Sequence, residues 1–191
     1  DLYLIKHKPG IGDDGKIKLP TGFLQGQKID LIFKELTLPV SHIKNFDQLN
    51  IPFRAVATDI TTGEMVVLSS GDLAKSMRAS MSIPSIFAPM EMDGRLLVDG
   101  GVSNNLPIDV ARDMGAEIVI VVDISTPLKK RGELTSALSI TAQLTGILTR
   151  RNTEAQIATL SGKDILIVPD LGDVSSSDFN ESGKAIPEGR V

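Results

Sequence analysis

Apolar and polar positions fall into short, separate patterns along the chain, and each pattern predicts an element. A helical period over 25–36 and again over 72–81 predicts two helices with one apolar face each. A longer helical stretch, 133–160, is interrupted by the polar residues 150–152, which leaves either one helix or two. Short apolar runs typical of strands lie at 53–58, 65–68, 90–92, 95–98, 118–122 and 165–168.

Turn residues join these segments. Asp93-Gly94 predicts a tight hairpin between 90–92 and 95–98. Pro107 is typical of a helix start, so 96–122 forms a strand–helix–strand unit. The unbroken β-branched run 118–122 is typical of a parallel strand that is covered on both faces. The order of elements therefore predicts an α/β fold, a mixed sheet with helices on both faces.

The glycine-rich stretch Gly10–Gly15 matches the G-x-G-x-x-G pattern of dinucleotide-binding loops. That loop requires a strand before it and a helix after it. Here the alternating sequence 16–20 follows and ends in proline, which favours a hairpin or a surface loop.

Length and composition narrow the class of protein. The 191 residues, 41% apolar and 23% charged, fit one globular domain, predicted over 1–170, with 171–191 as a polar closing segment or the start of a linker. The net charge of −4 gives no reason to expect nucleic acid as a partner. The chain has no cysteine, which excludes disulfides and a cysteine nucleophile. The opening Asp1-Leu2-Tyr3 resembles the middle of a chain, so we expect a longer parent protein.

Three predicted strands end in aspartate: Asp59, Asp99 and Asp123. Such a residue either caps the following turn or faces a ligand at the carboxyl end of a strand. Asp99 differs from the other two because Gly100 and Gly101 follow it, and glycines leave space beside a carboxylate. Asp99 is therefore the candidate catalytic group, with Gly100 and Gly101 as its flanking motif.

One carboxylate supports several kinds of chemistry. It could bind a metal, although no His or Glu lies at ligand spacing, or form a glycosidase pair with Asp93 or Asp109. It could also act as the base for a serine nucleophile. His7 and His42 lie in loop-like segments and are more typical of surface histidines, so the aspartate would then act on serine directly.

Two further features have both a functional and a structural interpretation. Ile86, Phe87 and Met90 could line an acyl-chain groove or belong to the core. Arg54 and Arg78 could bind phosphate or simply pair with an acid.

Several of these motifs, in this order, resemble the C-terminal half of bacterial patatin-like phospholipases. The resemblance rests on the stretches 53–59, 78–84, 98–101 and 104–107 and covers essentially the whole chain. It implies a three-layer α/β/α fold and hydrolysis of lipid esters by a Ser–Asp dyad, without a metal or organic cofactor. The family's Asp-Gly-Gly/Ala motif, which carries the dyad aspartate, matches Asp99.

The chain departs from the family in one respect. The G-x-S-x-G nucleophile motif and the glycine-rich oxyanion loop do not occur, and neither Ser69 nor Ser70 has the pattern of a glycine on both sides. The resemblance therefore implies a domain that is incomplete at its N-terminal side, with the serine upstream, and a chain that is inactive alone. The alternative is a non-catalytic lipid-binding or assembly fragment.

Expected partners are a phospholipid or other lipid ester, a membrane surface, the upstream segment in the same or a separate chain, and a second copy in a homodimer. Cell envelope, secreted and cytoplasmic locations stay open.

Overall fold

The structure is a computed structural model, and it describes residues 10–11, 17–18, 22–24, 26–172, 183 and 185–188. Its helices are α1 Gln27–Thr37, α2 Leu73–Ser80, α3 Gly101–Asn104, α4 Ile108–Asp113, α5 Ala137–Ile157 and α6 Ala185–Glu188. Its strands are β1 Gly10–Ile11, β2 Ile17–Lys18, β3 Gly22–Leu24, β4 Ala55–Asp59, β5 Met65–Leu68, β6 Ser85–Phe87, β7 Met90–Met92, β8 Arg95–Asp99, β9 Ile120–Val122 and β10 Ile165–Ile167.

Four of these strands form an antiparallel sheet in the order β5-β4-β8-β7. Two hairpins account for the order of the strands. The β7–β8 hairpin turns at Asp93 and Gly94, with φ of 50° and 73°, which is the left-handed conformation that a two-residue hairpin needs. The predicted hairpin at this position is confirmed. The sheet places the C-terminal end of β8 beside β4, so Asp99 lies opposite Ala57.

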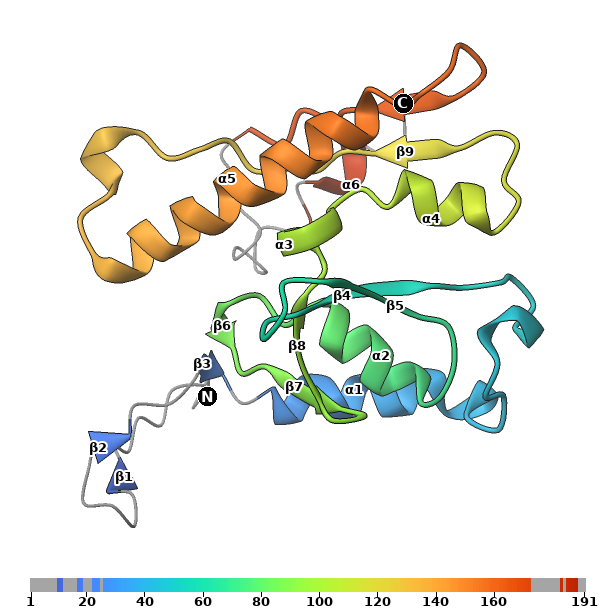
Figure 1. The fold of residues 1–191 in the computed structure, drawn as a ribbon, viewed down its shortest axis with the longest axis horizontal. Coiled ribbons are helices and arrows are strands. Elements are labelled where there is room, and N and C mark those ends of the chain that lie inside the picture. The colour runs from blue at the N-terminus through green and yellow to red at the C-terminus, as the bar shows by residue number, and fades with distance from the viewer. Residues whose placement is uncertain are drawn as a thin grey trace.

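Helices cover both faces of this sheet. α2 packs against β4 and β8 and α1 packs on α2, while α3 contacts β4 and separates it from α5. Figure 1 shows α1 and α2 below β4 and β5, and α3 and α5 above them. This helix–sheet–helix arrangement confirms the α/β fold class. Six buried residues from the sheet and α2 form the core: Ala55, Ala57, Val66, Leu68, Ala79 and Leu97.

The C-terminal part of the chain forms a second packing unit. β9 and β10 pair in parallel, and Ile108 of α4 packs on Val119 and Val121 beneath them. Both side-chain oxygens of Asp164 accept hydrogen bonds from Arg112, at 2.7 and 2.6 Å. The backbone N–H groups of Ser161 and Val119 also donate to Asp164, and these contacts hold its pKa well below the usual range.

The strands divide into separate sheets, whereas the sequence predicts one mixed sheet. β8 already has a neighbour on each edge, β4 and β7, and β9 pairs with β10. The expectation that 118–122 is covered on both faces was wrong for the described residues. Val119 and Val121 are buried, but Ile120 is 66% exposed and its neighbours Ile118 and Val122 are exposed too. Only one face of β9 has a partner in the part of the chain that the structure describes.

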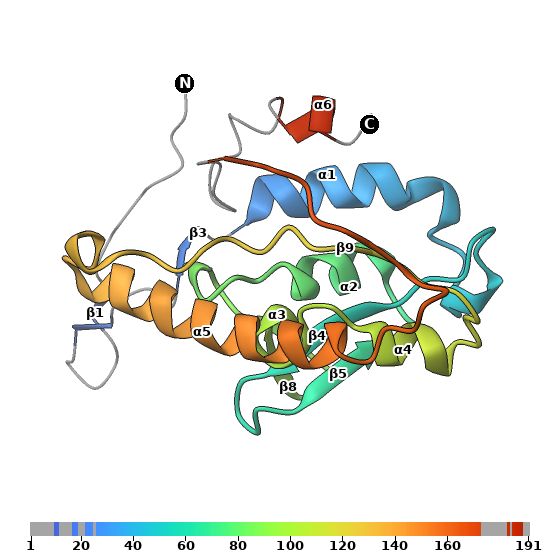
Figure 2. The ribbon, with the colours of Figure 1, turned by 90° about the horizontal axis from the view of Figure 1, so that it is seen from above.

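The long C-terminal helical stretch is a single helix. α5 continues through the polar residues 150–152 without a break, and Figure 2 shows it running alongside α3 and α4. At the other end of the chain, Gly10 and Ile11 pair antiparallel with Ile17 and Lys18. This pairing agrees with the hairpin interpretation, and residues 12–15 of the glycine-rich stretch lie outside the described residues. Most of 171–191 lies outside the described residues, and the domain boundary at 170 stays a prediction.

Candidate active site

The backbone of Asp99 is held by two different segments. Its N–H donates to the carbonyl oxygen of Ser82 at 3.0 Å, and its carbonyl oxygen accepts from Thr58 Oγ1 at 3.0 Å. Thr58 Oγ1 also lies 2.8 Å from Ser103 Oγ, which joins β4 to the helix α3 that follows Asp99. Because β8 and β4 pair up to Asp99 and Ala57, the main chain here has little freedom. These contacts therefore fix the position of the Asp99 backbone, from which the carboxylate side chain extends.

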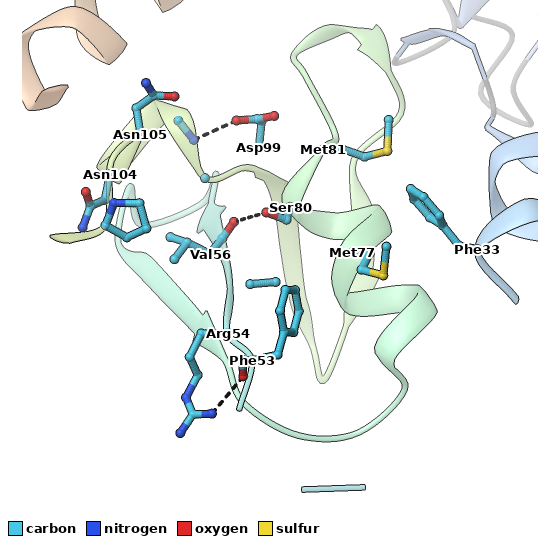
Figure 3. A pocket seen from close by; sticks show the side chains of 14 residues that line it. Phe33, Phe53, Arg54, Val56, Met77, Ser80, Met81, Asp99, Asn104 and Asn105 are labelled. Carbon is cyan, nitrogen blue, oxygen red and sulfur yellow. Dashed lines mark hydrogen bonds between the residues drawn. The ribbon is translucent and has the colours of Figure 1, made fainter. Parts of the chain in front are cut away.

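The Asp99 carboxylate has a backbone donor close by. Its Oδ1 accepts a hydrogen bond from the N–H of Gly101 at 2.7 Å (Figure 3). Burial raises the pKa of Asp99, and the Gly101 N–H offsets part of that rise. A carboxylate with a raised pKa binds a proton more readily near neutral pH, which makes it a more effective general base.

The place that a side chain would take at each glycine is filled by other atoms, although both glycines line open space beside the carboxylate. A Cβ on Gly100 would lie 2.2 Å from the backbone carbonyl oxygen of Val56. A Cβ on Gly101 would lie 2.9 Å from Asp99 Oδ1 and 2.9 Å from Asn105 Oδ1. Gly100 has an ordinary helical φ of −65°. Both positions need glycine because other atoms occupy the place of the side chain.

Asp99 lines a cavity of about 430 Å³. In Figure 3, Phe33, Met77 and Met81 lie on one side of Asp99, and Asn104 and Asn105 lie on the other. The methionines and Phe33 give the cavity an apolar side next to the single carboxylate. The remaining lining residues are Phe53, Arg54, Ala55, Val56, Ser80, Gly100, Gly101 and Pro107.

The other strand-end aspartates cap turns. Asp59 is buried, and its Oδ1 accepts from the backbone N–H and the Oγ1 of Thr61, at 3.0 and 2.7 Å. The Thr61 hydroxyl is the main reason that the pKa of Asp59 is lowered. Asp123 Oδ1 accepts from the backbone N–H of Ser125 at 2.9 Å. Neither aspartate lines the cavity, in agreement with the structural interpretation of both.

The proposed carboxylate partners of a glycosidase pair are also engaged elsewhere. Asp93 lies in the exposed β7–β8 turn. Asp109 accepts hydrogen bonds from Asn104 Nδ2 at 2.8 Å and from the N–H of Val110 at 2.9 Å. The cavity therefore contains one carboxylate, Asp99, from the described residues.

Among the described residues, His42, Arg54 and Arg78 make no hydrogen bond or ion pair with Asp99. His42 is exposed and lies outside the cavity lining, and His7 falls outside the described residues. Arg54 Nη2 pairs with Asp47 at 2.7 Å. Arg78 is buried and lies 3.2 Å from Asp30 Oδ1, in agreement with the ion-pair interpretation of both arginines.

Two of the three residues considered for an acyl-chain groove, Phe87 and Met90, pack in or against the core. Phe87 is 1% exposed, and the guanidinium of Arg78 lies 4.9 Å above its ring. Met90 packs against the core of the antiparallel sheet. None of Ile86, Phe87 and Met90 lines the cavity, whose apolar side comes instead from α1 and the α2 region.

Two negative findings apply to the described part of the chain. No group of three or more His, Cys, Asp or Glu residues there is placed to hold a metal ion. No helix among those residues combines the length and the apolar character needed to cross a bilayer.

Residues 18–112 match the protein family described as patatin-like phospholipase. This range contains Asp99 and both motif glycines, together with β4, β8 and α2, which position them. Just under half of the chain is thus similar to patatin-like phospholipases, and the resemblance of the motifs is supported over 18–112 and not over the whole chain.

Three curated relatives that match part of this chain are much longer proteins. Patatin-like phospholipase domain-containing protein 7 of Mus musculus is 42% identical over 108 residues, 56% of this chain and 7% of that protein. An uncharacterised NTE family protein of Mycobacterium tuberculosis is 38% identical over 104 residues, 54% of this chain and 28% of that protein. Patatin-like phospholipase domain-containing protein 6 of Homo sapiens is 44% identical over 85 residues, 44% of this chain and 6% of that protein. The similarity therefore includes mammalian as well as mycobacterial proteins.

Proposed function

We propose that this chain is part of a lipid acyl hydrolase, a phospholipase A-type serine esterase in which Asp99 is the general base. The observation that carries the proposal is the Asp99 carboxylate, half-buried beside an apolar-sided cavity within a patatin-like domain. The activating partner of the serine is then the carboxylate itself, since no histidine of the described residues lines the cavity.

The reaction proceeds in two proton transfers through Asp99. A serine Oγ attacks the ester carbonyl carbon while Asp99 accepts the hydroxyl proton. Collapse of the tetrahedral intermediate breaks the bond to the alcohol, which leaves with that proton, and an acyl-enzyme remains. Water then attacks the acyl-enzyme while Asp99 accepts one proton of the water, and Asp99 passes that proton to the serine Oγ as the bond to the acyl group breaks and the fatty acid is released. No cofactor takes part in either step.

The serine of this proposal lies in the N-terminal part of the domain. That part is either upstream of Asp1 in the same protein or a separate chain. Two observations support this placement. The sequence contains no G-x-S-x-G motif. The outer face of β9 and both faces of β10 are apolar and exposed, although parallel strands are normally covered on both faces. A preceding segment of the domain would cover that surface.

A non-catalytic lipid-binding or assembly fragment is the second candidate, because the nucleophile motif is missing from the chain itself. The hydrolase and a lipid-binding fragment both take a lipid ester as ligand, at a membrane surface or from solution, and they differ in whether the ester bond breaks. An assembly fragment does not require a lipid ligand.

The test is release of fatty acid from phosphatidylcholine vesicles. The full-length protein that contains this chain should release fatty acid, and residues 1–191 alone should bind vesicles or remain free without releasing any. Vesicle binding by the full-length protein with no release would favour the second candidate. Fatty acid release by residues 1–191 alone would contradict an upstream serine.

A further inference from the structure

The helix α5 approaches the Asp99 turn with its polar residues. Ile140, Leu144 and Leu148 on this helix are exposed, at 50%, 58% and 49%. In contrast, Thr153 is 3% exposed, and it lies where α5 contacts α3. An amphipathic helix usually buries its apolar face. The polar stretch of α5 therefore makes specific contacts that its apolar residues do not make.

Two side chains of α5 converge on the carbonyl oxygen of Gly101. Thr149 Oγ1 donates to it at 3.0 Å, and Asn152 Nδ2 donates to it at 3.0 Å. The N–H of the same glycine donates to Asp99 Oδ1 at 2.7 Å. The carbonyl oxygen of Gly101 is thus bound by α5, and the N–H of Gly101 binds the Asp99 carboxylate.

Asn152 also replaces a hydrogen bond within α3. In a regular helix the N–H of Asn105 would donate to the carbonyl oxygen of Gly101, four residues earlier. Here the Asn105 N–H donates to Asn152 Oδ1 at 2.9 Å, while Asn152 Nδ2 donates to the Gly101 carbonyl. The amide bridges the two groups, and its orientation follows from them because one end must donate and the other must accept.

A third contact lies beside this bridge. Asn105 Nδ2 donates to Thr153 Oγ1 at 3.1 Å, so Thr153 and Asn152 both bind Asn105. The donors and acceptors come from residues about 50 positions away in the sequence. α5 lies outside residues 18–112, so the match to the family does not include it.

We propose that Thr149 and Asn152 are positioning residues, which act on Asp99 through Gly101. The proposal rests on the proposed role of Asp99 as general base. Thr149 and Asn152 do not line the cavity, so they act on the carboxylate and not on the substrate. Without them Gly101 can move away from Asp99, and the N–H that binds the carboxylate is lost.

The sign of the expected pH effect follows from this hydrogen bond. The Gly101 N–H lowers the pKa of Asp99, which burial has raised. Loss of the N–H leaves the burial effect uncompensated, so the pKa of Asp99 rises further. A general base works only when deprotonated, so the acid limb of the pH–kcat profile moves to higher pH.

The test uses the full-length protein with the paired substitution Thr149→Val and Asn152→Leu, which removes both donors at similar size. We expect faster amide hydrogen exchange in the peptide containing 99–105. We also expect kcat to be lower by about 10- to 100-fold with little change in KM, and the acid limb of the pH–kcat profile to lie at higher pH. Thr149→Ser keeps the hydroxyl and should stay close to wild type. Thr141→Val is the control, because Thr141 Oγ1 donates only to the Ala137 carbonyl within α5.

Three outcomes separate the possibilities in a folded paired variant. Unchanged hydrogen exchange in 99–105 would overturn the contact between α5 and the Asp99 turn. Faster exchange with wild-type kcat and pH profile would reduce α5 to a structural role and overturn the positioning proposal. Failure of the proposed function is seen independently, as absence of hydrolysis in the wild-type protein, and the exchange measurement still decides whether α5 holds the turn.

Discussion

The Asp99→Asn variant of the full-length protein is expected to lose hydrolysis of lipid esters by about 10²–10⁴-fold while its fold stays intact. Asparagine has nearly the same shape, and its Oδ1 can still accept the Gly101 N–H that lies 2.7 Å from Asp99 Oδ1. It cannot accept the proton of a serine. The substitution therefore removes the base and leaves the packing. The measurement is kcat for fatty acid release, with circular dichroism to verify the fold.

Asp113→Asn is the matched control for this variant. Asp113 is an exposed carboxylate at the end of α4, outside the cavity lining, and the substitution makes the same change in charge. It should keep wild-type activity. Near-wild-type kcat in Asp99→Asn would remove Asp99 from the mechanism.

The second large effect is expected from Gly100→Ala. The new Cβ would lie 2.2 Å from the Val56 carbonyl oxygen and 2.6 Å from its carbon, and backbone atoms cannot turn aside as a side-chain tip can. The same carbonyl oxygen accepts a hydrogen bond from Ser80 Oγ at 2.7 Å. β4 and the Asp99 turn must separate, so we expect a loss of about 1–3 kcal/mol in the free energy of unfolding and a fall in kcat.

Gly132→Ala is the control, because a Cβ added at Gly132 would have nothing within 4 Å and the residue has no left-handed φ. Both variants add one methyl group, so their difference isolates the contact with Val56. Thermal and urea unfolding of the two variants compare their free energies of unfolding directly. Equal stability and equal activity would show that the close approach of Gly100 to β4 is unimportant.

Local sequence patterns predicted the elements around the site well. The two-residue turn at Asp93 and Gly94 can form only one kind of hairpin, and the structure has it. Asp72, at the start of the helix predicted over 72–81, caps α2, and its Oδ1 accepts a hydrogen bond from the Lys75 N–H at 3.1 Å. These features depend on neighbouring residues, whose chemistry is visible in the sequence.

The contacts around Asp99 were harder to predict because they join residues far apart in the chain. The polar stretch 150–152 was visible as an interruption of an apolar pattern, but nothing local indicates that Asn152 binds Gly101 and Asn105. Gly100 shows the same difficulty. Glycine is equally consistent with open space and with tight packing, and only the position of Val56 decides between them.

Burial on the two faces of an element also depends on distant residues. Phe87 is a large apolar residue of the kind that lines a lipid-binding groove, yet Arg78 covers its ring and the side chain is buried in the core. Ile120 lies in a pattern typical of a buried strand and is exposed among the residues that the structure describes. Apolar patterning predicts that a residue needs a partner, and it does not identify the partner.

The central claim is that Asp99 serves a serine that lies outside this chain, and a fluorophosphonate probe tests it most directly. The probe reacts covalently with an activated serine, and mass spectrometry of the labelled peptides identifies that residue. For the full-length protein we predict one labelled serine, located upstream of Asp1, with labelling strongly reduced in the Asp99→Asn variant. Labelling of a serine within residues 1–191, or undiminished labelling in Asp99→Asn, would contradict the account.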